Sequence, residues 1–539
     1  MTLAALFTSA DALELAAESA GGKTAAQFPA ETVTYSELFD RASEIARALL
    51  ALGVNRGDSV AIYMVNCTDY IAASFALAMV GAVMVPLSTR LREAELGSLV
   101  IRSRARVVLS CAVSVDRIDR LPFLRQGILA VRGQEEGAEP LLMELGGSSC
   151  EGVLAGDQVR TLMAAVSDYD LRERRSCVRS RDPGVIIFTS GTTGQPNGAI
   201  LTHEAFLRAS LTLIKRFQLG QSDVVWDAKP FFHFGGLESL LATVIAQATY
   251  VTLPFFEPDA AVQQLRESRS TVAWPVFDAI WRRVMEHPDF SAAAASLRSV
   301  GLLGNSETLR HAQRRTPNAI VTTAYGATEC GPVSYTRLED SEAIRFETVG
   351  HPAPGVEIRI VDPETRKDVG PELIGEMAYR GPMSFDGYYM DPDLTNQYLD
   401  EDGWYYSGDL GKRRIDGHLV YVGRVKEMLK VGGENVVTTA VEACLLAHDA
   451  VSVAAVVGYP DEIYTEVPIA FVELTGSGCS ASELTDFCRR VLPSFAVPRA
   501  FYSVQDWPMS TTKIRKVSLQ GWLVGERLEE CRSEPARMN

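Results

Sequence analysis

Apolar and polar residues follow two alternating periods through most of the chain. The stretch SELFDRASEIARALLALG, residues 36–53, places apolar residues at helical spacing and ends on a glycine. The apolar run at 58–64 then indicates a strand, residues 69–81 indicate a second helix, and residues 82–87 a second strand. Helices that alternate with short apolar strands predict an α/β fold with layered, mostly parallel sheets.

The pattern changes near residue 422. A turn-rich stretch at 402–423 indicates short hairpins, and a compact set of helical and strand patterns follows it, at 437–448, 451–460, 468–474 and 480–492. We therefore predict a large N-terminal domain of several subdomains over 1–422, a hinge over 423–426, and a small mobile α+β domain over 427–539.

Three other stretches bear on location and on loops. Residues 133–180 show the weakest periodicity and are rich in Gly, Ser and charge, so surface loops are expected there. Two uncharged stretches, 71–89 and 239–256, approach the roughly 20 residues that span a bilayer, but Pro86 and Pro254 interrupt them. Each is interpreted as a buried helix that leads into a strand. The first residues lack the basic region of a signal peptide. We expect a cytoplasmic protein without a membrane span.

Charge and cysteine content exclude several classes of partner. The formal net charge of −16 disfavours nucleic acids and anionic membranes. The nine cysteines include no C-x-x-C pair, so free thiols in a reducing compartment are expected. Cys444 and His448 can share a helix face, but no further metal ligand stands near them in the sequence.

Glycines and hydroxyl side chains concentrate in one loop, TSGTTGQPNG at 189–198, directly after the apolar strand VIIF. Glycine permits the close backbone approach by which N–H groups surround phosphate oxygens, and hydroxyl groups add donors. The Walker sequence G-x-x-x-x-G-K-[ST] does not align with this loop. The alternatives are a phosphate-binding loop of another kind and a glycine-rich hairpin without a ligand.

The loop resembles the signature T-S-G-T-T-G-x-P-K-G of the adenylate-forming superfamily, which includes acyl-CoA and aryl-CoA synthetases, peptide-synthetase adenylation domains and beetle luciferases. Four more stretches resemble motifs of that superfamily in the same order, namely YGATECG at 325–331, YYSGDLG at 405–411, GRVKEMLKVGGEN at 423–435 and PMSTTKIRK at 508–516. The resemblance covers nearly the whole chain. It implies ATP and Mg²⁺ as cofactors.

The resemblance also implies roles for the matched residues of the large domain. Tyr325, next to Gly326, would stack on the adenine, and Gly304 is the residue retained in the adenine-side loop. Thr328 would contact the α-phosphate and Glu329 would hold Mg²⁺, which neutralises phosphate charge during attack. The β- and γ-phosphates would bind the first six loop residues, Thr189, Ser190, Gly191, Thr192, Thr193 and Gly194.

For the end of the chain, the resemblance implies two sets of residues. Asp409 would accept the ribose hydroxyls, and Arg424 would reach the same ribose. Lys426 would be the hinge residue, and Lys430 would face the site during the second half-reaction. Lys513 would lie beside the α-phosphate, where a lone mobile cation suits charge that develops only during attack.

The sequence departs from the superfamily pattern at two of these places. Asn197 stands where the signature has a lysine, which predicts weaker ATP binding or slower turnover. The final motif lacks the glycine before Lys513, and the spacing from Pro508 is one residue short. Lys516 is therefore the alternative candidate for the adenylation lysine.

Residues on the acid-substrate side follow from the resemblance of PFFHFGGLES to a segment of acyl-CoA synthetases. There, His233 and aromatic residues such as Phe232 would gate the acyl tunnel, although His233 has the alternative interpretation of a buried core histidine. Trp274 and Leu303 stand where smaller residues are common, which favours a small or flat acid. Ala324 is assigned to the same pocket. The segment lacks the aspartate that holds an α-amino group, so amino acids are disfavoured.

We therefore predict an ATP-dependent acid–thiol ligase. A small or aryl carboxylate and Mg·ATP would give an acyl-AMP and pyrophosphate, and CoA would then take the acyl group as a thioester. CoA is the expected thiol because no carrier domain is recognised in the chain. The alternatives are transfer to a carrier protein or an amine, including nitrite activation for N–N bond formation. A catalytically weakened nucleotide-binding homologue and a structural protein also remain.

Overall fold

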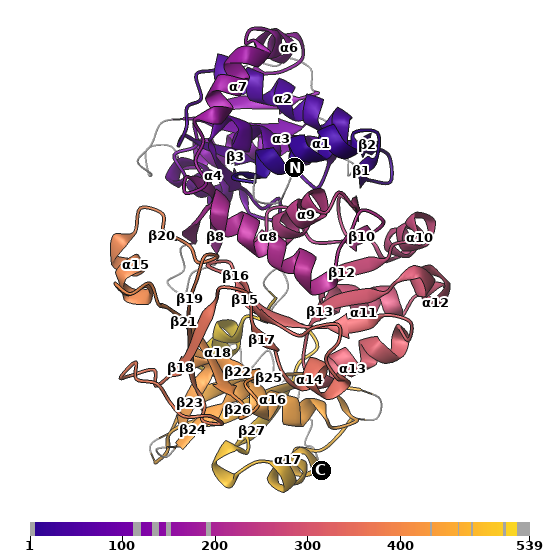
Figure 1. Cartoon of the computed structure of the whole chain (residues 1–539). Coiled ribbons are helices and arrows are strands. Elements are labelled where there is room, and N and C mark those ends of the chain that lie inside the picture. Colours follow the sequence, from indigo (N-terminus) through magenta and orange to yellow (C-terminus); the bar gives the residue numbers. More distant parts are fainter. Residues whose placement is uncertain are drawn as a thin grey trace. The chain divides into compact units, whose positions relative to one another are not determined.

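The chain forms two compact units in this computed structural model (Figure 1). Unit 1 comprises Met1–Glu357 and Arg380–Tyr405, and unit 2 comprises Ile358–Tyr379 and Tyr406–Asn539. The predicted domain boundary at 422 and the hinge over 423–426 describe which part of the chain moves, and they stay predictions. The structure describes residues 6–111, 120–131, 139–146, 152–189, 196–431, 434–461, 463–475, 478–509 and 514–524.

An eight-stranded sheet in unit 1 has the order β20-β9-β8-β4-β3-β5-β6-β7. Its strands from β8 to β7 are parallel, whereas β9 and β20 are antiparallel to their neighbours. The strands are β3 Ser59–Ile62, β4 Val83–Pro86, β5 Val107–Cys111, β6 Leu141–Leu145, β7 Val153–Leu154, β8 Pro183–Thr189, β9 Asn197–Thr202 and β20 Gly387–Tyr388. The helices between its parallel strands are α3 Thr68–Val80, α4 Glu93–Arg102, α5 Arg120–Ala130, α6 Asp157–Ala164 and α7 Asp168–Ser176.

A seven-stranded sheet, the second in unit 1, has the order β14-β13-β12-β10-β11-β1-β2. All of its pairs are parallel except β1 with β2. The strands are β1 Thr24–Gln27, β2 Thr32–Thr34, β10 Val224–Asp227, β11 Thr249–Thr252, β12 Val272–Phe277, β13 Ser299–Leu303 and β14 Ile320–Thr322. Trp226 on β10 packs against Trp281 in the core of this layer, with ring centroids 6.0 Å apart.

The remaining helices of unit 1 surround these two sheets (Figure 1). They are α1 Ser9–Ala20, α2 Tyr35–Ala51, α8 His203–Phe217, α9 Phe234–Ile245, α10 Pro258–Ser268, α11 Asp278–Met285, α12 Phe290–Ala293, α13 Ser306–Arg315, α14 Glu342–Glu347 and α15 Pro392–Tyr398. The helices and strands predicted between residues 36 and 87 are present, with ends within two residues of the prediction. The predicted α/β class with mostly parallel sheets is thereby confirmed.

The expectation of surface loops over 133–180 is wrong for the described part of that stretch. Strands β6 and β7 and helices α6 and α7 lie there. Helix α7 begins with a capping box, in which the Ser167 hydroxyl donates to Asp170 at 2.6 Å and accepts from its backbone N–H. The capping residues thus start α7, although its mostly charged sequence shows no apolar period.

The two uncharged stretches form buried elements of unit 1, as predicted. The first becomes α3 with β4, and the second becomes most of α9 with β11. Helix α3 is buried along almost its whole length. None of the helices that the structure describes combines the length and the apolar content that crossing a bilayer requires.

Unit 2 contains two sheets and the helices that accompany the second of them, and it confirms the predicted small α+β part. One sheet has the order β18-β19-β21-β22, with β18 Glu357–Val361, β19 Gly375–Arg380, β21 Tyr405–Arg413 and β22 Leu419–Arg424. The other has the order β24-β23-β26-β25, with β27 beside β26. Its elements are β23 Met428–Val431, β24 Glu434–Val437, α16 Thr438–Leu446, β25 Val451–Asp461, β26 Thr465–Leu474, α17 Ala481–Val491, β27 Ala500–Ser503 and α18 Lys516–Val524.

Candidate active site

The motif YGATECG folds into a tight hairpin of unit 1. Strand β15, Ala324–Ala327, pairs antiparallel with β16, Gly331–Tyr335, so Thr328 and Glu329 lie in the connecting turn. Gly326 lies so close to the backbone carbonyl of Gly331 that a side chain would clash with it. Thr328 and Glu329 are half-buried. The hairpin therefore presents a hydroxyl and a carboxylate together on a short, sterically fixed turn.

Glu329 is held by a residue that the sequence analysis did not identify. The Tyr388 hydroxyl donates to Glu329 Oε1 at 3.0 Å, and the Phe385 N–H donates to the Glu329 carbonyl at 2.8 Å. The Tyr388 and Tyr405 hydroxyls lie 3.3 Å apart. Burial, and next the Glu329 carboxylate, raise the pKa of Tyr388 well above its usual value, so this phenol stays protonated as a donor. No local motif indicates this contact, because 59 residues separate the two partners.

The base of the predicted phosphate loop is an antiparallel strand pair. Thr189 at the end of β8 pairs with Asn197 at the start of β9, and the Thr189 hydroxyl donates to the Asn197 carbonyl at 3.3 Å. Arg102, at the end of α4, donates to the Pro196 carbonyl at 3.3 Å. The other five loop residues assigned to phosphate lie outside the described residues, namely Ser190, Gly191, Thr192, Thr193 and Gly194.

Strand β20 connects the base of this loop to Glu329. Its residue Tyr388, the Glu329 partner, pairs with Ala199 on β9, and the next residue, Tyr389, donates its N–H to the Gly198 carbonyl at 2.7 Å. The structure thus brings together two motifs that are more than a hundred residues apart in the sequence.

His233 precedes α9 and lies among aromatic rings. Its ring centroid is 4.7 Å from that of Phe232, and the Arg90 guanidinium lies 5.9 Å from the Phe232 ring. Burial, and next the charge of Arg90, lower the pKa of His233 to about 4. Phe234 contacts the hairpin at Gly331, where an added side chain would come within 3.0 Å of its ring. A neutral imidazole therefore lies on the segment that packs against the Glu329 hairpin.

The other residues assigned to the acid pocket differ sharply in burial. Trp274 is 2% exposed and packs at 5.1 Å against Phe217 in the core, whereas Leu303, at the end of β13, is 41% exposed. Gly304 follows it, directly before α13, and Ala324 is half-buried at the start of β15. The two side chains thus differ in burial, and the narrowing of the pocket stays a prediction.

A cluster of ionisable side chains that the sequence analysis missed is buried beneath this region. Lys229 Nζ lies 3.1 Å from Asp227 Oδ2, and 5.5 Å from the Trp274 ring. Burial raises the pKa of Asp227, and the Lys229 charge opposes that shift. Burial also raises the pKa of Glu238 to about 8, and its Oε1 has no hydrogen-bond partner among the described atoms. At neutral pH, Glu238 is therefore mainly a neutral acid.

Asp409 and Arg424, the two residues predicted to bind the ribose, contact each other on neighbouring strands of unit 2, and their role stays a prediction. Asp409 on β21 is paired in register with Arg424 on β22, and Arg424 Nε lies 3.0 Å from Asp409 Oδ1. The Asp409 carboxylate is buried, while the Arg424 side chain is 52% exposed. The pair offers one buried acceptor and one solvated donor, which matches the needs of a diol.

The predicted lysines of unit 2 lie in different surroundings. Lys426 is in the 3₁₀ turn Val425–Glu427. Lys430 on β23 is 50% exposed and 3.9 Å from Glu364 Oε1. Lys513 lies outside the described residues. Lys516, its alternative, donates to Glu427 Oε2 at 3.0 Å and forms an ion pair with a second carboxylate at 2.8 Å, so its ammonium group is held inside unit 2.

Two family models match the chain. The model described as "AMP-binding enzyme" matches residues 13–389, and the "AMP-binding enzyme C-terminal domain" matches residues 440–513. The chain belongs to the AMP-binding enzyme family.

Relatives of this AMP-binding enzyme cover nearly its whole length. It is 31% identical to the medium-chain fatty-acid–CoA ligase of Escherichia coli (strain K12), over 90% of this chain and 85% of that protein. It is 30% identical to 4-coumarate–CoA ligase 2 of Oryza sativa subsp. japonica, over 82% and 78%. The structure matches ATP-bound MatB from Rhodopseudomonas palustris with a TM-score of 0.81 and 26% identity, over 95% and 98%. The AMP-binding enzyme is thus a ligase of the AMP-forming acyl-CoA type.

A cavity of about 560 Å³ opens in unit 1 of the AMP-binding enzyme, at the C-terminal end of α8. Tyr335, the last residue of β16, lines it together with Lys215, Arg216 and Arg337. Arg216 is buried, which lowers its pKa to about 10, and its Nη2 donates to the Thr322 hydroxyl at 3.0 Å. Among the described residues that line this cavity, three are cationic and one, Glu339, is a carboxylate, so an anionic group suits it.

Proposed function

We propose that this AMP-binding enzyme activates a small or aryl carboxylic acid with ATP and transfers the acyl group to CoA. The hairpin that presents Thr328 and Glu329, with Glu329 held by Tyr388, is the observation that carries the proposal. In the first step, a carboxylate oxygen attacks the α-phosphorus and the bond to pyrophosphate breaks. In the second, the CoA sulfur attacks the acyl carbon and AMP leaves, while the thiol proton passes to solvent.

Residues of unit 1 would serve the first step. The donor set fits a hard cation, because Glu329 offers a half-buried carboxylate whose orientation Tyr388 maintains. When bound, Mg²⁺ would be held by Glu329 and would neutralise charge on the phosphates. Thr328 would donate to an α-phosphate oxygen. His233, neutral above about pH 4, would leave the incoming carboxylate without a charged partner and so preserve its nucleophilicity.

Arg102 is proposed to replace part of the charge that the signature lysine supplies in relatives. Its guanidinium binds the Pro196 carbonyl, directly before Asn197. The guanidinium group stays charged and has donors to spare after one hydrogen bond. Arg102→Ala should therefore raise the KM for ATP with little change in the KM for the acid, whereas Arg283→Ala, an exposed arginine of α11, serves as the matched control.

Residues of unit 2 would act in both steps. Asp409 and Arg424 would bind the ribose, and Lys513 would stabilise the charge that develops on the α-phosphate. A swing about Lys426 would then exchange Lys513 for Lys430 when CoA enters. This division of labour predicts that Lys513→Ala abolishes pyrophosphate release, whereas Lys430→Ala spares it and slows thioester formation.

The deciding experiment measures pyrophosphate release from Mg·ATP with short aliphatic, aryl, dicarboxylic and long-chain acids and with nitrite, each with and without CoA. Dicarboxylic acids belong in the set because cations line the cavity beside β16. Release that depends on one class of acid and yields its CoA thioester supports the proposal. Acid-dependent release that yields no thioester assigns the acyl group to an amine or a carrier protein.

Glu329→Gln tests whether the hairpin carries the chemistry. Removal of the carboxylate charge should lower pyrophosphate release by about 10²–10³-fold, as is typical of a lost transition-state stabiliser. Glu286→Gln, an exposed glutamate next to α11, is the matched control and should leave the rate unchanged. ATP binding without release, by the unaltered chain and with every acid, would instead identify a nucleotide-binding homologue that lacks the chemistry.

A further inference from the structure

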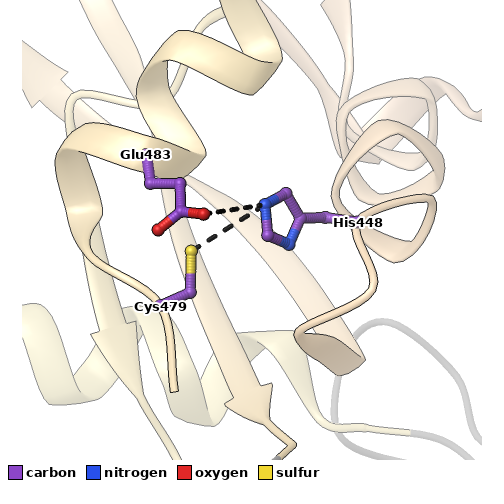
Figure 2. Close-up of side chains that lie close together, drawn as sticks. All are labelled: His448, Cys479 and Glu483. Carbon is purple, nitrogen blue, oxygen red and sulfur yellow. Dashed lines mark hydrogen bonds and ion pairs between the residues drawn. The ribbon is translucent and has the colours of Figure 1, made fainter. Parts of the chain in front are cut away.

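Three potential metal ligands converge in unit 2, between the end of α16 and the start of α17 (Figure 2). His448 Nε2 lies 3.9 Å from Cys479 Sγ and 3.9 Å from Glu483 Oε1. The three ligand atoms all lie within 4.8 Å of one another. Strands β25 and β26 separate His448 from the other two in the sequence, so the fold and not a local motif assembles the group.

The imidazole and the carboxylate are too far apart for a direct hydrogen bond, while sulfur makes only weak, long contacts to both. A hydrogen bond between imidazole and carboxylate has a heavy-atom distance of about 2.7–3.2 Å, so 3.9 Å is too long for one. Ligand atoms bound at about 2.0–2.3 Å around one tetrahedral Zn²⁺ lie roughly 3.3–3.8 Å apart. The two separations of 3.9 Å from His448 need to shrink by less than about 0.6 Å when an ion enters, and that between Cys479 and Glu483 can need to shrink more.

Glu483 does not form the capping box that its position in α17 predicts. It is the third residue after the N-cap Ser480, and the Ser480 hydroxyl accepts from its N–H at 3.1 Å. In α1, α2 and α7, the acidic side chain at this position accepts a hydrogen bond from the N-cap backbone N–H. No such bond to Glu483 is found among the described atoms of α17. Its carboxylate faces His448 and Cys479 instead (Figure 2).

The other two ligands are also positioned by the fold. The His448 ring packs edge-on against Phe487 of α17, with centroids 4.9 Å apart. Cys479 is half-buried and donates weakly to the Ser480 carbonyl at 3.6 Å. Because His448 Nδ1 accepts from the Ala450 N–H at 3.2 Å, ligation through Nε2 requires the ring proton to move to Nδ1 and that long bond to break.

We propose that His448, Cys479 and Glu483 form a binding site for one Zn²⁺ ion, with water as the fourth ligand. An imidazole, a thiolate and a carboxylate are a ligand set that Zn²⁺ prefers and that Mg²⁺ avoids. Binding forms three bonds from the ion to N, S and O and releases one thiol proton to solvent, which leaves the site neutral. The ion would tie the end of α16 to the start of α17.

The site is independent of the adenylation chemistry. It lies within unit 2, whereas the Mg²⁺ ligand proposed for catalysis, Glu329, lies in unit 1. Because a bound ion stabilises only the folded state, Zn²⁺ should raise the thermal midpoint of unit 2 by mass action. Cys444, a turn before His448, contacts Cys488 and takes no part in the site.

Cobalt substitution tests the site directly. The full chain, stripped of metal with a chelator, is titrated with Co²⁺ in excess Mg²⁺, and a near-ultraviolet thiolate-to-cobalt band should saturate at one ion per chain. Zn²⁺ should abolish the band by displacement. Cys479→Ser should remove it, and Glu483→Gln should weaken binding more than about tenfold. Cys177→Ser and Asp486→Asn, an exposed cysteine of unit 1 and an exposed acid of α17, are the matched controls and should bind as the unaltered chain does.

Thiol alkylation provides a readout that does not depend on colour. Mass spectrometry measures the rate at which each cysteine is alkylated. Zn²⁺ should slow the alkylation of Cys479 markedly and leave that of Cys177 unchanged. Equal circular dichroism of metal-free Cys479→Ser and the unaltered chain excludes misfolding as the cause of lost binding. An absent cobalt band, a band that survives Cys479→Ser, or alkylation that ignores Zn²⁺ would each overturn the proposal.

Discussion

Two ionisable groups buried in unit 1 contrast with two that are half exposed in unit 2. In unit 1, Asp227 and Glu238 are 0% and 6% exposed, and they lie beneath the segment that carries His233. In unit 2, Arg424 and Lys430, the residues assigned to ribose and to the second step, have half of their side chains in solvent. The orientation of a buried charged group is fixed when the protein folds, whereas a solvated group can change partners with little change in free energy. Asp227 and Glu238 are therefore fixed by the core of unit 1, whereas Arg424 and Lys430 can exchange contacts without a change of fold.

The largest loss of stability should come from removing the partner of a buried charge in unit 1. Asp227→Ala removes the carboxylate 3.1 Å from the Lys229 ammonium, which is buried. An uncompensated buried charge lowers the free energy of unfolding by about 3–5 kcal/mol. Urea unfolding followed by tryptophan fluorescence measures it, since Trp226, Trp274 and Trp281 lie in this unit. The double variant Asp227→Ala with Lys229→Met should recover most of the loss, and an unchanged midpoint in the single variant would contradict the interpretation.

A pH dependence should follow from Glu238 in the same cluster. Its pKa of about 8 in the folded chain lies above its usual value, so folding favours the protonated acid. The stability that this provides is complete below about pH 4 and is lost as pH rises to about 8, which amounts to about 3 kcal/mol between pH 5.5 and 8. Urea midpoints measured across that range should fall for the unaltered chain and stay flatter for Glu238→Gln. Glu339→Gln, an exposed glutamate, is the control, and parallel slopes in all three would refute the prediction.

A smaller effect is expected for the partly buried ion pair of unit 2. Lys516→Met removes the partner of Glu442, whose carboxylate still accepts the Val456 N–H at 2.7 Å. Because this hydrogen bond remains, the loss should be about 1–3 kcal/mol, read from hydrogen exchange in α16. Pyrophosphate release by the folded variant should be unchanged. A loss of release without a loss of stability would assign the adenylation role to Lys516 instead of Lys513.

The smallest effect should come from a solvated ion pair of unit 2. Lys412 Nζ lies 2.7 Å from Glu372 Oε2, and the two side chains are 32% and 43% exposed, more than those of Lys516 and Glu442. Lys412→Ala should leave the urea midpoint unchanged within error, because exposed pairs contribute little. A shift as large as that of Lys516→Met would mean that the two units do not differ as described.

The sequence predicted a helix or strand correctly where the residues that form that element also determine it. The helix ending near Gly53 and the strands beside it appear within two residues of their prediction, because apolar period and terminal residues act over one or two turns. The motif residues Thr328 and Glu329 were identified through the resemblance. The polar helix α7 was missed, because capping and not apolar spacing defines it.

Contacts between segments that are distant in the sequence could not be predicted from local patterns. Tyr388 reaches Glu329 only because β20 is added to the edge of the sheet beside β9. The buried ion pair of Asp227 with Lys229 depends on the strand end and loop that cover them. In the sequence, His448 could be grouped only with Cys444, whereas the fold brings it together with Cys479 and Glu483. Such groups require knowledge of which elements become neighbours.

The position of β1 in the seven-stranded sheet has a consequence for synthesis on the ribosome. Its partner is β11, and the Thr249 hydroxyl donates to the Thr24 carbonyl across 225 residues. At translation rates of about 5–20 residues per second, the first strand emerges roughly 10 to 45 s before its partner is made. During that interval β2, α2 and α3 can already cover part of α1 and β1, but the edge of β1 that pairs with β11 has no partner. A nascent chain therefore exposes one unpaired strand edge near its beginning until the middle of the chain has been made.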